Sequence, residues 1–570
     1  MPNARNPLNT SAIRAASDAA TLIARGVTKY RGAQAVLDTV AVSIGAETRL
    51  GVLGPNGVGK TTLLRILAGL DQPDEGRVTL LPSTATVGYL AQERDALEGE
   101  TLAEYLARRT GVAEAEAVLD RAAGALSSSD QRADSRYDAA LERYLALGGP
   151  DLEARAGSVC DDLALPASLL DLGMSQLSGG QAARAALAAL LLSKFDIVLL
   201  DEPTNDLDFE GLERLEDFLE RRGGGLVVVS HDRAFLERIV TSVGEIDPGS
   251  HMLTLYRGGW EAYLEARATG QRHAEETYLA YSAERDRLVQ RARQQRKWAV
   301  SGVSKASNDP KDKDKVQRDF RINRTEKQAS KVRATERALE RLTEAEKPFE
   351  PWLLRLEMAA APRSGDVVSR LEAAVIRLGS WQLGPVDLEI RWGDRLAILG
   401  RNGVGKTTLL SAILGTLPLD AGRRWVGPRV VFGELGQARQ RFGADEPLMT
   451  GFLAESGLPT REARSLLAKF DLGPGEVERH FATLSPGERT RAELALLMSK
   501  GTNCLVLDEP TNHLDLPAIE QLEAALSSWN GTLLLVTHDR RLLDAVSLSS
   551  TFEIGPRSAR VQTRRSTLPT

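Results

Sequence analysis

The motif G-x-x-x-x-G-K-[ST] occurs twice in this chain of 570 residues, each time between a strand-like and a helix-like segment. The first copy follows the apolar residues 50–53 and leads into 62–70, and the second follows 396–399 and leads into 408–417. This strand–loop–helix context is what gives the motif its weight. The glycines let backbone N–H groups turn inward around phosphate oxygens, and the helix N-terminus adds positive potential. The chain is therefore predicted to hold two nucleoside triphosphates.

The two loops supply the first predicted contacts. Lys60 and Lys406 are expected to reach the β- and γ-phosphates, and the hydroxyls of Thr61 and Thr407 are expected to ligate Mg²⁺. The predicted nucleotide-binding residues of the loops are Gly54, Pro55, Asn56, Gly57, Val58, Gly59, Lys60, Thr61 and Thr62 in the first copy, and Gly400, Arg401, Asn402, Gly403, Val404, Gly405, Lys406, Thr407 and Thr408 in the second.

A second pair of segments shows that the whole domain is repeated. Asp-Glu-Pro-Thr-Asn stands at 201–205 and again at 508–512, and 29 residues separate Glu202 from His231 just as they separate Glu509 from His538. Two versions of one domain are predicted at 21–265 and 366–557. Residues 1–20 are predicted to be a flexible N-terminal segment and residues 558–570 a C-terminal tail.

The paired acids and the histidines follow apolar, strand-like segments. A buried parallel strand delivers its last side chains to the carboxyl edge of the sheet, where α/β folds bind ligands. Asp201 and Asp508 therefore suit a Mg²⁺ shell, and the glutamate after each can orient or deprotonate the attacking water. His231 and His538 are predicted to contact the γ-phosphate. Gln92 and Gln437 are predicted to sense the metal and the water.

The stretch between the repeated domains differs in composition. Residues 266–350 are rich in helix-forming Glu, Arg, Ala, Gln and Lys, and are interrupted by Gly302 and by the turn signal Ser-Asn-Asp-Pro at 307–310. Two long helices joined near 300–312 are predicted, as a hairpin linker. Residues 291–333 carry fourteen Lys or Arg and five Asp or Glu, a net charge of +9, whereas the remainder carries −15. A polyanionic partner is indicated, and a merely solvated helix pair is the alternative.

The first repeat is also longer than the second. From Gln92 to Leu177 there are 85 residues, but from Gln437 to Leu484 there are 47. The additional material around 100–150 is Ala-rich and is predicted to be a helical insertion. It could be a contact arm or an elaborated helical subdomain.

Composition excludes some classes of protein. No run of 18 or more apolar residues occurs, and the first twenty residues contain no apolar signal core, so neither a transmembrane segment nor secretion is predicted. Two cysteines, Cys160 and Cys504, are too few for a disulfide framework and are interpreted as small core residues. A cytoplasmic protein is predicted.

Two further segments carry a resemblance to a known superfamily. Leu-Ser-Gly-Gly-Gln at 177–181 and Leu-Ser-Pro-Gly-Glu at 484–488 each precede a helix-like run and resemble the signature motif of ATP-binding cassette proteins. The resemblance implies an α/β fold with two P-loop ATP-binding cassette domains, each a mixed sheet core with a helical subdomain. It also implies head-to-tail packing, in which each ATP lies between one loop and the signature of the other cassette. Ser178, Gly179 and Gly180 would then complete the second site, and Ser485 and Gly487 the first, with ATP and Mg²⁺ as cofactors.

Two departures distinguish the predicted sites. Tyr30, 24 residues before Gly54, resembles the aromatic residue that stacks on adenine in the superfamily, whereas the same offset before Gly400 gives Ile376. Trp381 is a weaker substitute there. In the second signature Pro486 has no N–H to donate to a phosphate. The two sites are therefore not expected to be equivalent.

Within the superfamily, the chain resembles the ABC-F family, soluble tandem-cassette proteins that act on ribosomes. The motifs that carry this are Asn-His-Leu-Asp at 512–515, Ser-His-Asp-Arg at 230–233, Thr-His-Asp-Arg at 537–540 and Tyr-Arg-Gly-Gly-Trp at 256–260; the first cassette departs with Asn-Asp-Leu-Asp at 205–208. The resemblance implies a monomeric ATPase whose basic linker hairpin acts on rRNA and tRNA, as a translation factor or in resistance to ribosome-targeting antibiotics. The alternatives are the ATP-binding subunit of a membrane transporter with fused cassettes, and a non-catalytic scaffold.

Overall fold

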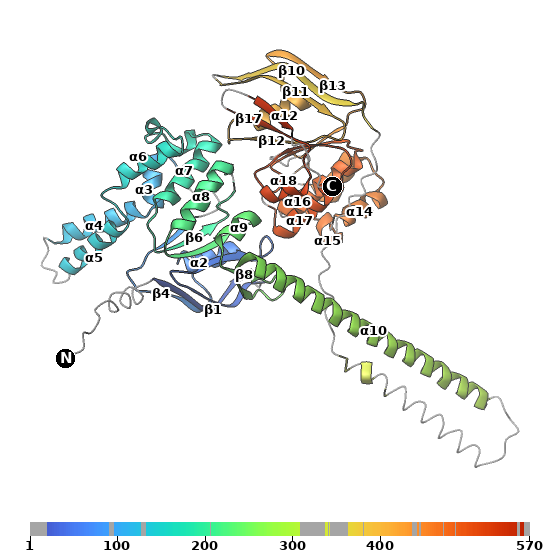
Figure 1. Ribbon diagram of the computed structural model, residues 1–570. Helices are drawn as coiled ribbons and strands as arrows, with labels where there is room; N and C mark the ends of the chain where they lie inside the picture. The colour runs from blue at the N-terminus through green and yellow to red at the C-terminus, as the bar shows by residue number, and fades with distance from the viewer. Residues whose placement is uncertain are drawn as a thin grey trace, which may run out of the picture. The chain divides into compact units, whose positions relative to one another are not determined.

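The computed structural model (Figure 1) describes most of the chain. The described residues are 20–32, 34–90, 96–126, 133–205, 207–307, 334, 337–339, 341, 342, 363–379, 381–435, 442, 443, 446–470, 472–484, 486–512, 514–555 and 559–563. They fall into two compact units, one formed by Met1–Trp260 with Trp352–Thr570 and the other by Glu261–Pro351. The first unit holds both repeated domains, which we call cassette 1 and cassette 2.

Cassette 1 contains two sheets. The smaller is antiparallel, in the order β2(Gln34–Ile44), β1(Thr21–Arg31), β4(Glu75–Leu81). The larger has the order β5(Val87–Leu90), β6(Ile197–Asp201), β7(Gly225–Val229), β3(Arg49–Leu53), β8(Ser242–Ile246), β9(Leu253–Arg257). All neighbours in it are parallel except β8 and β9. Strands β6 and β7 are buried along their whole length, which explains their continuous apolar sequences.

The helices of cassette 1 lie beside the large sheet or form the helical subdomain. They are α2(Lys60–Leu67), α3(Leu102–Arg109), α4(Val112–Ala125), α5(Ala133–Ala146), α6(Leu152–Asp162), α7(Gly179–Leu192), α8(Phe209–Arg221) and α9(Arg233–Ile239), with short 3₁₀ turns at Ala167–Leu169 and Met174–Gln176. The predicted insertion at 100–150 is thus helical: α4 and α5 pack against each other, and the residues between them, 127–132, lie outside the described ones.

Cassette 2 repeats this arrangement with a smaller helical subdomain. Its antiparallel sheet has the order β11(Trp381–Arg391), β10(Val367–Leu378), β13(Ala421–Val426). Its larger sheet has the order β14(Phe432–Leu435), β15(Cys504–Asp508), β16(Thr532–Val536), β12(Arg395–Gly400), β17(Ser550–Ile554), β18(Ala559–Thr563). Its helices are α12(Lys406–Leu414), α13(Leu448–Ser456), α14(Thr460–Lys469), α15(Pro474–Val477), α16(Pro486–Ser499), α17(Leu516–Ser527) and α18(Arg540–Ala545), with a 3₁₀ turn at Phe481–Thr483.

Each cassette has a core between its two sheets. In cassette 1, Leu22 and Ile44 of the antiparallel sheet are buried together with Val52 and Val229 of the large sheet and Leu63 of α2. In cassette 2, a second core joins its sheet to the helical subdomain and is rich in phenylalanine; it includes Phe442, Phe452, Phe470 and Phe481. Cys160 and Cys504 are free and buried, as predicted, and burial raises the pKa of the Cys160 thiol to about 11.

The described residues of the second unit include most of one long helix, α10(Gly259–Ser307). This helix coincides with the first helix predicted for the linker. The predicted second helix and much of the basic stretch 291–333 lie outside the described residues. Within the described part of the chain, no helix combines the length and the apolar character that crossing a membrane requires.

Candidate functional site

The lysine of each phosphate-binding loop folds back onto its own loop. Lys60 Nζ donates to the carbonyl oxygen of Gly54 at 2.7 Å, and Lys406 Nζ donates to that of Gly400 at 2.8 Å. Burial lowers the pKa of both ammonium groups, although nearby carboxylates oppose the shift. A buried ammonium group bonded to neutral acceptors is well prepared to exchange them for phosphate oxygens.

The glycines that precede these lysines cannot be replaced without distortion. Gly59 and Gly405, which cap the N-termini of α2 and α12, have φ angles of 113° and 101°, in the left-handed region. A Cβ atom on Gly59 would lie 2.8 Å from the carbonyl oxygen of Val36, and one on Gly405 would lie 2.5 Å from the ring of Trp381. The close packing around each loop thus requires glycine and leaves the helix N-terminus open to an anion.

The paired acids end the central strands of the large sheets. Asp201 and Asp508 are the last residues of β6 and β15. Glu202 and Glu509 follow with φ angles of 50° and 48°, a conformation that residues other than glycine rarely adopt. The N–H of each glutamate donates to a carbonyl oxygen at the end of the neighbouring strand at 2.8 Å, which helps hold this conformation. Such strain, repeated at equivalent positions, is typical of functional residues.

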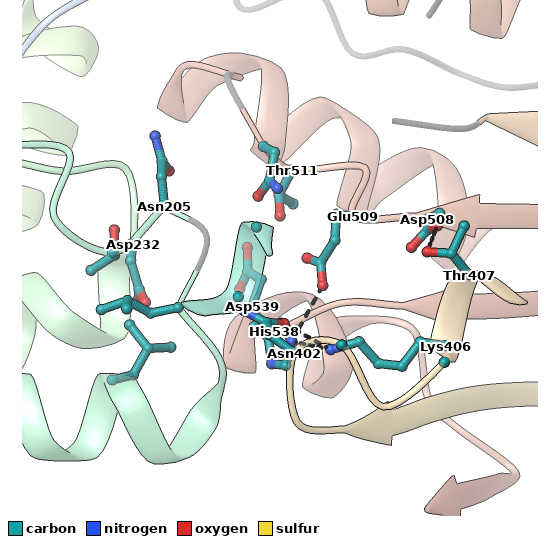
Figure 2. A pocket seen from close by; sticks show the side chains of 18 of the residues that line it. Asn205, Asp232, Asn402, Lys406, Thr407, Asp508, Glu509, Thr511, His538 and Asp539 are labelled. Carbon is teal, nitrogen blue, oxygen red and sulfur yellow. Dashed lines mark hydrogen bonds and ion pairs between the residues drawn. The ribbon is translucent and has the colours of Figure 1, made fainter. Parts of the chain in front are cut away.

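The aspartates meet the requirements of a Mg²⁺ ligand. Thr407 Oγ1 donates to Asp508 Oδ2 at 2.7 Å (Figure 2), and the hydroxyl of Tyr89 donates to Asp201 Oδ2 at 3.3 Å. Asp201 Oδ1 is buried and has no hydrogen-bond partner among the described residues. Burial raises the pKa of both carboxyl groups, and a bound cation would reverse that shift.

The donor set would hold Mg²⁺ only incompletely without other ligands. In the described part of the chain no group of three or more His, Cys, Asp or Glu side chains could enclose a metal ion. Mg²⁺ is commonly held by one or two protein oxygens, with phosphate oxygens and water completing the octahedron. A threonine hydroxyl beside a buried aspartate in each cassette fits that pattern.

Both histidines are neutral and lie beside the glutamates. Burial lowers the pKa of His231 and of His538 to about 3. His231 Nε2 lies 3.2 Å from a carboxylate oxygen of Glu202, and His538 Nε2 lies 3.4 Å from one of Glu509. Burial also raises the pKa of Glu202 to about 7. A glutamate with a pKa near neutrality is suited to accept a proton at physiological pH.

Among the described residues, the second site has one interaction that is not repeated at the first. His538 Nε2 lies 2.6 Å from Lys406 Nζ (Figure 2). Because the ammonium group can only donate, Nε2 accepts, and the ring proton lies on Nδ1.

Each phosphate-binding loop receives an aspartate from the other cassette. Asp208, the N-cap of α8, accepts a hydrogen bond from the backbone N–H of Asn402 at 2.9 Å. Asp515, the N-cap of α17, accepts one from the N–H of Asn56 at 3.4 Å. The two contacts are equivalent, because each aspartate stands six residues after the glutamate of its own cassette.

A cavity of about 580 Å³ lies between the two cassettes. Cassette 1 contributes Gly179 and Gly180 of the predicted signature, and the walls from cassette 2 include the loop residues Asn402, Gly403, Gly405, Lys406, Thr407 and Thr408 together with Asp508, Glu509 and His538. Figure 2 shows Lys406, Glu509 and His538 close together on one wall and Asn205 and Asp232 on the other. The cavity at the predicted second nucleotide site is therefore lined by residues of both cassettes.

Other predicted residues are placed as follows. Ser178 caps α7 and exchanges two hydrogen bonds with Gln181, so it begins the helix that carries the two glycines. Tyr30 is the last residue but one of β1 and has 45% of its surface exposed, which excludes a core role and leaves its ring open to a base. Trp381 lines the cavity beside the second loop. Gln92, Gln437 and Ser485 lie outside the described residues.

Sequence reasoning missed three contributors. Asp208 and Asp515 were noted only as members of a family motif, although their common offset from the glutamates could have drawn attention to them. Phe209, which contacts the ring of His538, gave no sequence signal, because cassette 2 has Leu516 at the equivalent position.

Comparison with known proteins identifies the family. The protein-family model described as "ABC transporter" matches residues 37–205 and 383–512. The tylosin resistance ATP-binding protein TlrC of Streptomyces fradiae is 35% identical over 92% of this chain and 96% of its own length. The energy-dependent translational throttle protein EttA of Mycobacterium tuberculosis is 32% identical over 91% and 88%. The ABC transporter F family member 2 of Arabidopsis thaliana is 28% identical over 90% and 73%.

A solved structure supports the fold independently. The complex of archaeal ribosomal stalk protein aP1 and the archaeal ribosome recycling factor aABCE1 contains a chain that matches with a TM-score of 0.52 and 19% identity, covering 94% of this chain and 89% of that one. The predicted α/β fold with two cassettes is thereby confirmed. With two matched cassettes and relatives that span nearly its whole length, the chain is an ATPase and belongs to the ABC-F family of tandem ATP-binding cassette proteins.

Proposed function

We propose that this ATPase binds two ATP molecules with Mg²⁺ between its cassettes and uses the cycle of binding and hydrolysis to act on the ribosome. The observation that carries the first half of this proposal is the cavity between the cassettes. It joins Gly179 and Gly180 of cassette 1 to Lys406, Glu509 and His538 of cassette 2, so neither cassette provides a whole site. ATP bound there would draw the cassettes together.

The predicted residues take the following roles in this proposal. Lys60 and Lys406 release their loop carbonyls and bind phosphate oxygens. Glu202 and Glu509 orient the attacking water and accept its proton. His231 and His538, neutral in the folded protein, contact the γ-phosphate.

Binding and metal residues complete the two sites. Mg²⁺, held by Thr61 with Asp201 and by Thr407 with Asp508, would neutralise charge on the phosphate oxygens. Tyr30 and Gln92 serve the first site together with Ser485 and Gly487, while Gln437 with Ser178, Gly179 and Gly180 serves the second.

The ribosome is proposed from the relatives and from the linker. One relative is named a translational throttle protein and another a tylosin resistance protein. Residues 291–333 carry a net charge of +9 on an otherwise acidic chain, which favours contact with RNA phosphates. We propose that the linker at 266–350 contacts rRNA and tRNA in the cytoplasm. We also propose that the protein acts as a monomer and gives resistance to a ribosome-targeting antibiotic.

The experiment compares the unmodified chain with the double variant Glu202→Gln, Glu509→Gln. The variant should still bind ATP, should not hydrolyse it, and should sediment with ribosomes in the presence of ATP, because the closed state can no longer reopen. Its expression should slow growth, whereas the unmodified chain should raise tolerance to tylosin.

A third variant tests the linker and the alternative function. Deletion of residues 291–333 should abolish sedimentation with ribosomes and leave ATP binding intact. If the full chain instead separates with membranes together with an integral membrane protein, the transporter alternative is correct. If the double variant permits normal growth and does not sediment with ribosomes, the proposed function is wrong.

A further inference from the structure

We propose that Phe209 of cassette 1 is a positioning residue for His538 of cassette 2, and that this contact makes hydrolysis at the second site depend on the docking of cassette 1. The two rings lie with their centroids 5.0 Å apart and their planes at 69°, an edge-to-face arrangement. The inference rests on the role proposed above for His538 and adds a residue to it.

The position of Phe209 is fixed by two hydrogen bonds of its neighbour. Phe209 is the first residue of α8, and Asp208 caps that helix by accepting the N–H of Gly211 at 3.0 Å. The other oxygen of Asp208 accepts the N–H of Asn402 in the phosphate-binding loop of cassette 2. One carboxylate therefore fixes the start of the helix and attaches it to the second nucleotide site. Phe209 reaches His538 from this attachment point.

The imidazole of His538 has little else to orient it. Its Nε2 faces Lys406 Nζ at 2.6 Å and Glu509 at 3.4 Å, and these are groups that would move when phosphate binds. Its Nδ1 is buried with no hydrogen-bond partner in the part of the chain that the structure describes. A functional histidine is usually oriented by a hydrogen bond from its second ring nitrogen. Here the aromatic contact from the other cassette takes that place.

The contact belongs to one site only. Leu516 stands at the position of Phe209 in cassette 2, after the cap Asp515. Leucine offers no quadrupole to an imidazole edge, so the first site cannot make the same contact. Phe209 is not among the residues that line the cavity in the described part of the chain, so the role assigned to it acts on ATP through His538.

The test measures steady-state ATP hydrolysis by the full-length chain. Phe209→Leu copies the residue of the other site, and Phe209→Tyr keeps the ring. Phe218→Leu is the matched control, because it makes the same change in the same helix at a position outside the nucleotide sites. All variants are made first with Glu202→Gln, so that turnover reports the second site. If the Glu202→Gln protein hydrolyses no ATP, the two sites hydrolyse only together. The Phe209 and Phe218 variants are then measured in the unmodified chain, where slower hydrolysis at the second site lowers the rate of the whole cycle.

Phe209→Leu should lower kcat by about twofold to tenfold, the range that corresponds to an aromatic pair, with KM for ATP unchanged. Phe209→Tyr should restore kcat, and Phe218→Leu should leave it unaltered. Added to His538→Ala, Phe209→Leu should cause no further loss.

Two results separate the possible failures. If His538→Ala leaves kcat unchanged, the role proposed for His538 is wrong. If His538→Ala lowers kcat but Phe209→Leu does not, or if Phe209→Leu raises KM instead, the positioning role of Phe209 is overturned while the proposed function stands.

Discussion

At the scale of single residues, the charges beside the first histidine are buried at a cost. Asp232 caps α9 by accepting the N–H of Phe235 at 3.0 Å, so its carboxylate has a structural role. Burial nevertheless raises its pKa to about 6, and Asp539 of the other cassette adds to the shift. Between about pH 4 and pH 6 the folded protein therefore holds a proton on Asp232 that the unfolded chain has already lost.

This gives the variant Asp232→Asn a pH-dependent benefit. Because the folded pKa exceeds the unfolded value of 3.8, the unmodified protein loses stability as pH rises from about 4 to about 6, and above the folded pKa the loss stays constant. Asparagine keeps the helix cap without the charge. Between pH 5 and pH 8 the variant should gain on the order of 1 kcal/mol over the unmodified protein, or about 2–4 °C in Tm by calorimetry.

Asp247→Asn is the control with the opposite sign. A hydrogen bond from the N–H of Ser250 at 2.7 Å lowers the pKa of Asp247, so the stability it contributes is fully present above the unfolded value of 3.8 and is lost only in acid. The Tm difference for Asp247→Asn should stay constant from pH 5 to pH 8. A constant difference for Asp232→Asn as well would contradict the prediction.

The predicted site residues that the structure brings together share a local signal. The loops, the acid pairs and the histidines each follow an apolar strand at a spacing that recurs in both cassettes. Phe209 could not be found in this way. Its partner His538 lies more than 300 positions away in sequence, and only the packing of two cassettes brings the rings together.

At the scale of elements, the strands were more predictable than the packing between them. Ile197–Asp201 had to be a strand, because five buried residues with no polar alternation suit a central parallel position. The neighbouring strand, Val87–Leu90, packs against Phe195, and the hydrophobic periodicity of the sequence does not predict this contact. The ring of Phe195 lies on Gly88, and a Cβ atom there would be 2.0 Å from the ring.

Two glycine-to-alanine variants should therefore have opposite effects. Gly88→Ala forces the ring of Phe195 to move and should destabilise cassette 1 by about 1–3 kcal/mol. Gly124→Ala, in α4, places its Cβ atom where no described residue lies within 4 Å and should stabilise the helix by up to about 1 kcal/mol. The midpoint of urea unfolding measures both. A Gly88→Ala protein as stable as the unmodified one would show that the ring of Phe195 can adopt another conformation without cost.

At the scale of the whole molecule, the repeat produces two reciprocal ion pairs between the cassettes. Arg233 of cassette 1 pairs with Glu523 of cassette 2, and Arg540 of cassette 2 pairs with Glu216 of cassette 1 at 2.9 Å. Each arginine stands 31 residues after Glu202 or Glu509 of its own cassette, and each partner glutamate stands 14 residues after the one of its own cassette. The two pairs occupy equivalent positions of the repeat. Their surroundings differ, because Glu216 also accepts a hydrogen bond from Arg238 at 2.6 Å.

Exchange of the charges should distinguish the two pairs. Arg233→Glu or Glu523→Arg alone buries an unpaired charge and should lower stability by about 3 kcal/mol, and combining them should restore most of the loss, because the pair is simply reversed. The same exchange at Arg540 and Glu216 should not recover, since an arginine at 216 would face Arg238. Calorimetric Tm and ATP hydrolysis of the six variants measure this. Recovery at both pairs would show that Arg238 does not constrain Glu216, and recovery at neither would show that the cassettes do not meet through these residues in solution.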